Sequence, residues 1–169
     1  MTQSTRTRIA SVVALTAVSL LCGATQAAAA DPVVLDIPAG VACADFGVRV
    51  TIDGEQLVNR EFVDRNGNVV RILGAGTGPT LTLTNVSSGA TFTAKSNGSV
   101  ARTVFNADGS QTVTIIGHNL LILFPSDVPA GPSTTLYAGR VAFTIDANEV
   151  FTVLQASGQA TDICAVLSE

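Results

Sequence analysis

The sequence predicts an all-β protein, an antiparallel meander of about ten short strands that closes as an up-and-down barrel or a barrel-like sandwich. Three observations lead to this prediction. Apolar and polar residues alternate with a period of two from Phe46 onward, which is the pattern of half-buried strands. Turn-forming pairs separate the alternating stretches. No segment after residue 30 keeps a helical period.

Residues 1–30 resemble an export signal and are not expected to belong to the fold. Two arginines precede a short apolar run, and three alanines precede Asp31, as at a signal-peptide cleavage site. The apolar run is shorter than the roughly twenty residues that a membrane span requires. We therefore expect cleavage after Ala30 and a secreted protein, with lipid anchoring at Cys22 as the alternative.

The remaining residues, 31–169, suit a single domain. Of nine Lys and Arg residues, two precede residue 30, so seven stand against thirteen acidic residues and the net charge is −6. The positive residues are scattered singly along the sequence. Nucleic-acid binding is therefore not expected, and no apolar run predicts a transmembrane segment.

The first strands follow from short alternating runs. Val48, Val50 and Ile52 point one way in the first run, and the runs around Leu81–Leu83 and Ala90–Ala94 repeat the pattern. Asn97-Gly98 is a two-residue hairpin pair and predicts that residues 91–96 pair with residues 99–105. Asn66-Gly67 and Asp108-Gly109 predict two further hairpins.

The stretch Thr112–Asp146 is expected to organise the fold. It holds the longest apolar run of the domain, Leu120–Phe124, and a later strand whose Val141, Phe143 and Ile145 alternate. We interpret Gly117-His118-Asn119 as a turn, Leu120–Phe124 as a buried strand, and residues 126–135 as a long loop before the next strand.

That loop is the candidate binding region. It is longer than the other predicted connections and carries several prolines, and long ordered loops are often functional. A rigid cover over a barrel end or a sheet edge is an equal alternative. The candidate binding residues on and beside it are Asp127, Pro129, Gly131, Pro132, Tyr137 and His118.

Cys43 and Cys164 are predicted to form a disulfide. In an exported protein a single, widely spaced pair of cysteines indicates a structural bridge. The residues directly beside each cysteine are aliphatic and cannot ligate a metal, so a metal site is not expected. The bridge would tie the start of the meander to its end, as closure of a barrel requires.

Three short motifs suggest chemistry but fit simple turns better. The glycine-rich segment 74–79 leads into a predicted strand, whereas phosphate-binding loops lead into a helix. The segment Asp64–Asn68 begins like a calcium loop. Its glycine stands at the fourth position of the loop and not at the sixth, and the twelfth position is not the glutamate that such loops require. Glu55 and Glu61 flank hairpins and do not predict glycoside hydrolysis.

His118, Asp127 and Ser133 include the residue types of a nucleophilic triad within one region. No nucleophile-elbow motif accompanies them. The sequence therefore predicts no catalytic residue and no cofactor.

The run FNADGSQTVTIIGHNLLILFPSDVPAGPSTTLYAGRVAFTID, the segment NREFVDRNGNVVRIL and the final Asp162–Ala165 resemble a group of small exported all-β proteins of high-GC Gram-positive bacteria. The resemblance covers nearly all of the domain and implies export and a single domain. It assigns no catalytic or binding residue.

Three functions are consistent with these features. The first is an extracellular non-catalytic binding domain for a small apolar molecule or an envelope component. The second is a structural or interaction protein of the cell surface. The third is a hydrolase that uses His118.

Overall fold

The computed structural model describes residues 31–54, 58–95 and 98–169 of the chain. The predicted export signal, with its cleavage site at Ala30 and the alternative lipid anchor at Cys22, lies outside these residues. Glu55 and Asn97 lie outside them as well. The structure therefore bears on the predicted domain and leaves the export signal a prediction.

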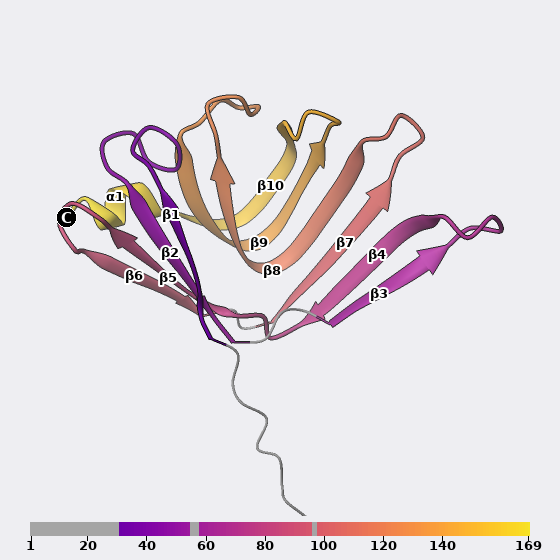
Figure 1. Cartoon of the computed structure of the whole chain (residues 1–169), viewed down its shortest axis with the longest axis horizontal. Coiled ribbons are helices and arrows are strands. Elements are labelled where there is room, and N and C mark those ends of the chain that lie inside the picture. Colours follow the sequence, from indigo (N-terminus) through magenta and orange to yellow (C-terminus); the bar gives the residue numbers. More distant parts are fainter. Residues whose placement is uncertain (1–30, 55–57, 96–97) are drawn as a thin grey trace, which may run out of the picture.

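Within the described residues, ten strands form two antiparallel sheets (Figure 1). The four-stranded sheet has the order β1-β2-β5-β6, with β1 at Val33–Ile37, β2 at Val48–Asp53, β5 at Thr80–Asn85 and β6 at Thr91–Lys95. The six-stranded sheet has the order β10-β9-β8-β7-β4-β3, with β10 at Phe151–Asp162, β9 at Ser133–Ile145, β8 at Gln111–Leu123, β7 at Ser99–Phe105, β4 at Val69–Gly76 and β3 at Val58–Val63. The all-β class is confirmed. Two layers fit a sandwich, and no closed barrel forms among the described strands.

The strand order differs from a single meander. The chain changes sheet between β2 and β3, between β4 and β5, and between β6 and β7. From β7 to β10 each strand pairs with the next, as the sequence predicts. Turn signals favour a local reversal of the chain, but they do not determine which strands pair or which sheet a strand joins.

The hairpin predicted at Asn97-Gly98 is wrong. β6 pairs with β5, and β7 pairs with β4 and β8. Phe92 and Ala94 of β6 lie opposite Leu83 and Leu81 of β5. This pairing extends the apolar face of the four-stranded sheet, which a hairpin with β7 would not do.

A row of small residues crosses the six-stranded sheet. Gly117 of β8 pairs with Gly139 of β9, which pairs with Gly158 of β10. The row continues through Ser99 of β7 and Gly76 of β4. We call the five residues Gly76, Ser99, Gly117, Gly139 and Gly158 the glycine row. Figure 1 shows that β8, β9 and β10 curve strongly.

The turn predicted at Gly117-His118-Asn119 is also wrong, because β8 runs without interruption through these residues. Gly117 has a φ of +117°, a conformation that other residues rarely adopt. The strand therefore bends at Gly117 while its ladder with β9 continues. A glycine signal in the sequence indicates a change of direction and does not distinguish a bend from a turn.

Two apolar clusters lie on opposite faces of the curved sheet. The first lies between the two sheets and includes Val48, Val50, Leu83, Leu120, Ile122 and Leu136. The second includes Val113, Leu121, Leu123, Val141 and Phe143, which come from both sides of the glycine row. Residues from both sides of a bend meet on its concave side. We therefore call the face of the second cluster the inner face and the opposite face the outer face.

The part of the six-stranded sheet beyond the glycine row projects away from the four-stranded sheet (Figure 1). It consists of β3, β4 and β7 with residues 111–116, 140–145 and 151–157 of the three long strands. We call this part the wing. On the other side of the row, residues 118–123 of β8 pair with β9 alone among the described strands. The reason is that β7 begins at Ser99, opposite Gly117, and does not extend beyond the row.

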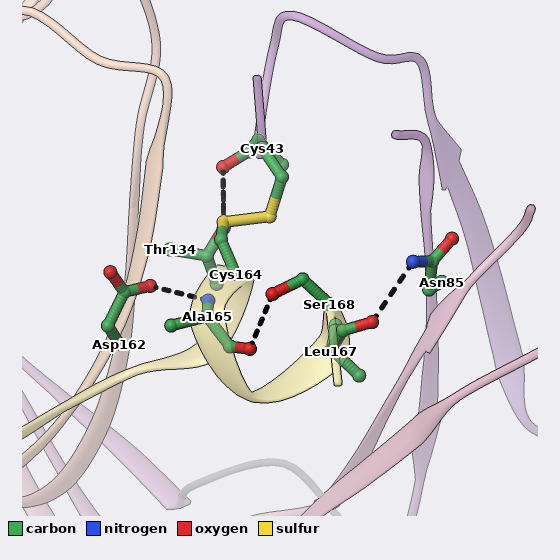
Figure 2. Close-up of a disulfide and its surroundings, with 9 residues drawn as sticks. Cys43, Asn85, Thr134, Asp162, Cys164, Ala165, Leu167 and Ser168 are labelled. Carbon is green, nitrogen blue, oxygen red and sulfur yellow. Dashed lines mark hydrogen bonds between the residues drawn. A yellow bond between two sulfur atoms is a disulfide. The ribbon is translucent and has the colours of Figure 1, made fainter. Parts of the chain in front are cut away.

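The disulfide predicted between Cys43 and Cys164 is present, with the two Cα atoms 5.6 Å apart. It joins the connection between β1 and β2 to a C-terminal helix, α1, at Ile163–Leu167 (Figure 2). The side chain of Leu167 is fully buried, and its carbonyl oxygen accepts a hydrogen bond of 3.0 Å from Asn85 Nδ2. The sequence did not predict this helix, because five residues are too few to show a helical period.

Candidate ligand pocket on the inner face

The long loop folds against the edge of β10. The carboxylate of Asp127 is buried, and it accepts hydrogen bonds from the backbone amides of Phe124 at 2.6 Å and Phe151 at 2.9 Å. The backbone of Val128 exchanges two further hydrogen bonds with Phe151 and Val153. Of the two roles expected for this loop, the geometry shows the cover of a sheet edge.

The other candidate residues of the loop have mostly backbone roles. The amide of Gly131 donates to the carbonyl of Phe124 at 2.9 Å, and a Cβ at Gly131 would overlap the carbonyl oxygen of Leu123. Pro129 is exposed. Pro132 lines a cavity of about 270 Å³ beside the disulfide.

The walls of that cavity mix polar and apolar residues, and one of its carboxylates, Asp162, has a structural role. Asp162 accepts a hydrogen bond of 3.1 Å from the amide of Ala165 and is the N-cap of α1 (Figure 2). Such a carboxylate satisfies an amide that the first turn of a helix leaves unpaired. We therefore do not assign a ligand to this cavity.

The residues of the possible triad do not come together. His118 pairs with Ala138 and Ser133 pairs with Leu123. The two register rows are offset by an odd number of positions along β8, so the side chains of His118 and Ser133 lie on opposite faces of the sheet. Both oxygens of Asp127 accept backbone amides. This arrangement provides no nucleophile–base–carboxylate relay.

The segment Asp64–Asn68 forms a turn of the kind that the sequence favoured over a calcium site. Asp64 Oδ1 accepts hydrogen bonds from the amides of Asn66 and Asn68, and Oδ2 accepts one from Asn68 Nδ2. These hydrogen bonds hold the pKa of Asp64 below its ordinary value, and the bond from the Asn68 side chain has the largest effect. Among the residues that the structure describes, no group of three His, Cys, Asp or Glu side chains could hold a metal ion.

The strongest candidate site is an apolar cavity of about 260 Å³ along the bend of the inner face. Its walls are Ile115, Asn119, Leu120, Leu121, Ile122, Val141, Phe143 and Phe151. The rings of Phe143 and Phe151 stack with their centroids 5.2 Å apart. Tyr137, a predicted binding residue, packs in the same apolar cluster. The cavity thus lies where the two arms of β8 and β9 face each other.

The cavity also meets the free side of a strand. The side chains of Leu120 and Ile122 pack between the two sheets, so these residues contribute mainly backbone to the cavity. Their strand segment pairs with β9 alone among the described strands. Asn119 is the one polar side chain in the wall, and its Nδ2 donates to the backbone carbonyl of Gly117 at 3.1 Å. An apolar ligand with a few polar groups would therefore find partners here.

Sequence reasoning missed this cavity. Its signal was the trio Gly117, Gly139 and Gly158, which lie in three separate segments. Their alignment depends on the register of β8, β9 and β10, which the alternation pattern alone does not determine.

Comparison of the chain with protein-family models, curated proteins and solved structures finds no significant match. In the described part of the chain, no helix has the length and apolar character needed to cross a membrane.

Proposed function

We propose that the protein is a non-catalytic binding domain of the cell exterior that holds a small apolar ligand in the inner-face cavity. The observation that supports this function is the cavity itself, about 260 Å³ in volume with aliphatic and aromatic walls and a single polar side chain. An apolar cavity of about 150 Å³ already holds benzene. A ligand somewhat larger than one aromatic ring therefore suits this site.

A location outside the cell is supported by the disulfide, because such bonds persist in oxidising compartments. The predicted export signal at residues 1–30 agrees with it. A hydrolase that uses His118 receives no support from the geometry described above, and we do not propose one. An interaction protein of the cell surface, the alternative expected from the sequence, is favoured by a different face, the outer face of the wing.

Two neighbouring residues of β8 provide a matched test. Ile115 lines the cavity, whereas Ile116 lies on the outer face and is 54% exposed. We expect the disulfide-bonded protein to bind a medium-chain fatty acid and the dye anilinonaphthalene sulfonate. Ile115→Phe fills the cavity and should reduce binding by about tenfold or more. Ile116→Phe adds the same volume outside the cavity and should leave binding unchanged.

Binding would be measured by isothermal titration for the fatty acid and by fluorescence for the dye, with native mass spectrometry to detect a ligand that co-purifies. Thermal midpoints of the two variants show whether each is folded. A wild-type protein that binds neither probe and carries no ligand contradicts the proposal. Equal losses in both variants would also contradict it, because the binding would then lie elsewhere.

A further inference from the structure

The outer face of the wing gathers arginines that are scattered along the sequence. Arg60 of β3 and Arg102 of β7 share one register row on either side of Leu73. Arg71 lies in the next register row of the same face on one side of them, and Arg140 lies in the next such row on the other side. With strands about 4.8 Å apart, the backbones at Arg60 and Arg102 are about 10 Å apart. Four of the seven positive residues after residue 30 thus share one sheet face.

These arginines lack counter-charges within the described residues. The ion pair found there joins Arg49 to Asp36 on the other sheet. Glu61 pairs with Ile72, and this row lies on the inner face. Asp108, in the turn between β7 and β8, accepts hydrogen bonds from the amide and hydroxyl of Ser110. Glu61 therefore faces the other side of the sheet, and Asp108 is bonded within its own turn.

Two of the arginines stack on an aromatic ring. The guanidinium carbon of Arg71 lies 4.0 Å from the ring centroid of Phe62, and that of Arg60 lies 5.2 Å from it. The Nε of Arg71 is buried and has no hydrogen-bond partner within the described residues. Stacking orders a guanidinium and leaves its outer edge available for a carboxylate.

An exposed apolar row lies beside the arginines. Val58, Val100 and Ile116 belong to one register row of β3, β7 and β8, with Ala75 of β4 between the first two. Their exposed fractions are 79%, 44% and 54%. Single exposed apolar residues are common, but a contiguous row indicates an interaction surface. Six strands and three register rows give a projected area of roughly 500 Å², which suits a small or transient interface.

We propose that the outer face of the wing docks an acidic polypeptide segment that presents carboxylates and apolar side chains on the same face. Arginine binds carboxylates in a bidentate manner, and the exposed apolar row would contact the apolar side chains of the segment. A protein partner suits the composition, because interfaces are rich in arginine and poor in lysine. A bilayer suits it less well. The chain has no Trp, its single Tyr lies on the inner face, and these are the residues that anchor proteins at membranes.

The test uses the disulfide-bonded protein and a labelled synthetic peptide of repeated Glu-Glu-Val-Val, which presents both residue types on each face of an extended chain. We expect binding by fluorescence anisotropy at low salt that weakens as salt rises. A peptide with glutamine in place of glutamate should bind about tenfold more weakly or not at all. Arg102→Gln should raise the Kd by about tenfold. Arg65→Gln changes the net charge equally but lies in the turn between β3 and β4, and it should leave the Kd within about twofold.

Three outcomes overturn the proposal. The first is no binding of the glutamate peptide at low salt. The second is an equal effect of Arg102→Gln and Arg65→Gln, which would show a response to net charge alone. The third is binding of phosphatidylglycerol vesicles without binding of the peptide, which would assign the face to a lipid surface. Because Arg102 is exposed, its variant should fold, and its thermal midpoint checks this. Failure of the inner-face cavity to bind ligand leaves this result unaffected.

Discussion

Gly139 of β9 lies directly between Gly117 of β8 and Gly158 of β10, and a Cβ atom at Gly139 would overlap the carbonyl oxygen of Ser157. The backbones of neighbouring strands therefore approach more closely at this row than side chains permit. The same close approach places the two arms of β8 opposite each other and forms the inner-face cavity. The fold and the candidate site thus depend on one row of small residues.

Gly139→Ala tests this row. The overlap involves backbone atoms of Ser157 and Gly158, which cannot move without disturbing the ladder. We expect the free energy of unfolding to fall by about 2–4 kcal/mol, in the range of severe core substitutions. Binding of apolar probes to the cavity should weaken as well. Denaturant titration and the probe titrations measure the two effects.

Gly109→Ala is the matched control. Gly109 has a φ of +84° and no atom within 4 Å of an added Cβ. The substitution carries conformational strain without overlap and should cost about 1 kcal/mol. If Gly139→Ala costs no more than this control, the close approach at the glycine row is not a constraint on the fold.

Asp127 should matter for stability and not for ligand binding. It is 3% exposed and accepts the amides of Phe124 and Phe151. Asp127→Ala leaves the two part-buried backbone amides unpaired, and a buried donor without a partner costs about 1–3 kcal/mol. We expect a loss of about 2–5 kcal/mol in the free energy of unfolding and faster hydrogen exchange at the Phe151 amide. Asp127→Asn keeps one acceptor and should be intermediate. An unchanged exchange rate in Asp127→Ala would show that these bonds do not hold the loop.

The sequence predicted the parts of the fold that depend on local chemistry. Alternation identified the strands, and the isolated pair Cys43 and Cys164 identified the disulfide. Asn97-Gly98 shows where prediction failed. Its preference for a reversal is local, whereas the choice between β5 and β7 as partner of β6 depends on an apolar face assembled from distant segments.

The candidate sites show the same contrast between features that depend on local sequence and features that depend on the pairing of distant strands. Asp127, Pro129 and His118 were chosen because they are chemically distinctive within one loop region. The cavity and the arginine face are formed from residues that are ordinary in sequence and become neighbours through strand register. Arg60 and Arg102 are 42 positions apart in the chain, and only one strand, β4, lies between them in the sheet. Register of this kind is not encoded by composition or by period-two alternation.

Acid should weaken the fold through the carboxylates of its hairpin turns. The pKa of Asp64 is lowered by its hydrogen bonds with Asn68, and the pKa of Asp108 by the hydroxyl and amide of Ser110. A carboxyl with a lowered folded pKa stabilises the folded state above its unfolded pKa, and this contribution is lost as the pH falls through the folded value. Both folded values lie below the ordinary 3.8. Thermal midpoints should therefore fall below about pH 4.

NMR titration checks the cause directly. The carboxyl carbons of Asp64 and Asp108 should titrate with midpoints below 3.8. Asp64→Asn removes the titrating group and should reduce the slope of the thermal midpoint with pH in the acid range. An unchanged acid slope in Asp64→Asn, or a midpoint at or above the ordinary value in the wild type, would contradict this account.

Removal of the disulfide should lower stability across the whole domain. Cys43 and Cys164 are separated by 121 positions, and closing a loop of that length corresponds to about 4–5 kcal/mol in the chain-entropy model. Part of the local structure should survive reduction. Thr134 Oγ1 donates to the carbonyl of Ala42 at 2.9 Å. Asn85 Nδ2 donates to the carbonyl of Leu167 at 3.0 Å (Figure 2). The first bond holds the β1–β2 connection to β9 and the second holds α1 to β5, so each segment joined by the bridge keeps a contact of its own without it.

We therefore expect Cys43→Ala with Cys164→Ala to lower the thermal midpoint by many degrees and to leave the circular dichroism of the folded fraction unchanged. Asn85→Ala is the local comparison, because it removes one buried hydrogen bond and should cost about 1–3 kcal/mol. Combined with the double cysteine change, it should release α1, seen as rapid hydrogen exchange at Leu167 while the β8–β9 ladder stays protected. Free thiols in the native protein, or an unshifted midpoint in the double cysteine variant, would show that packing alone holds the C-terminal helix to the β1–β2 connection.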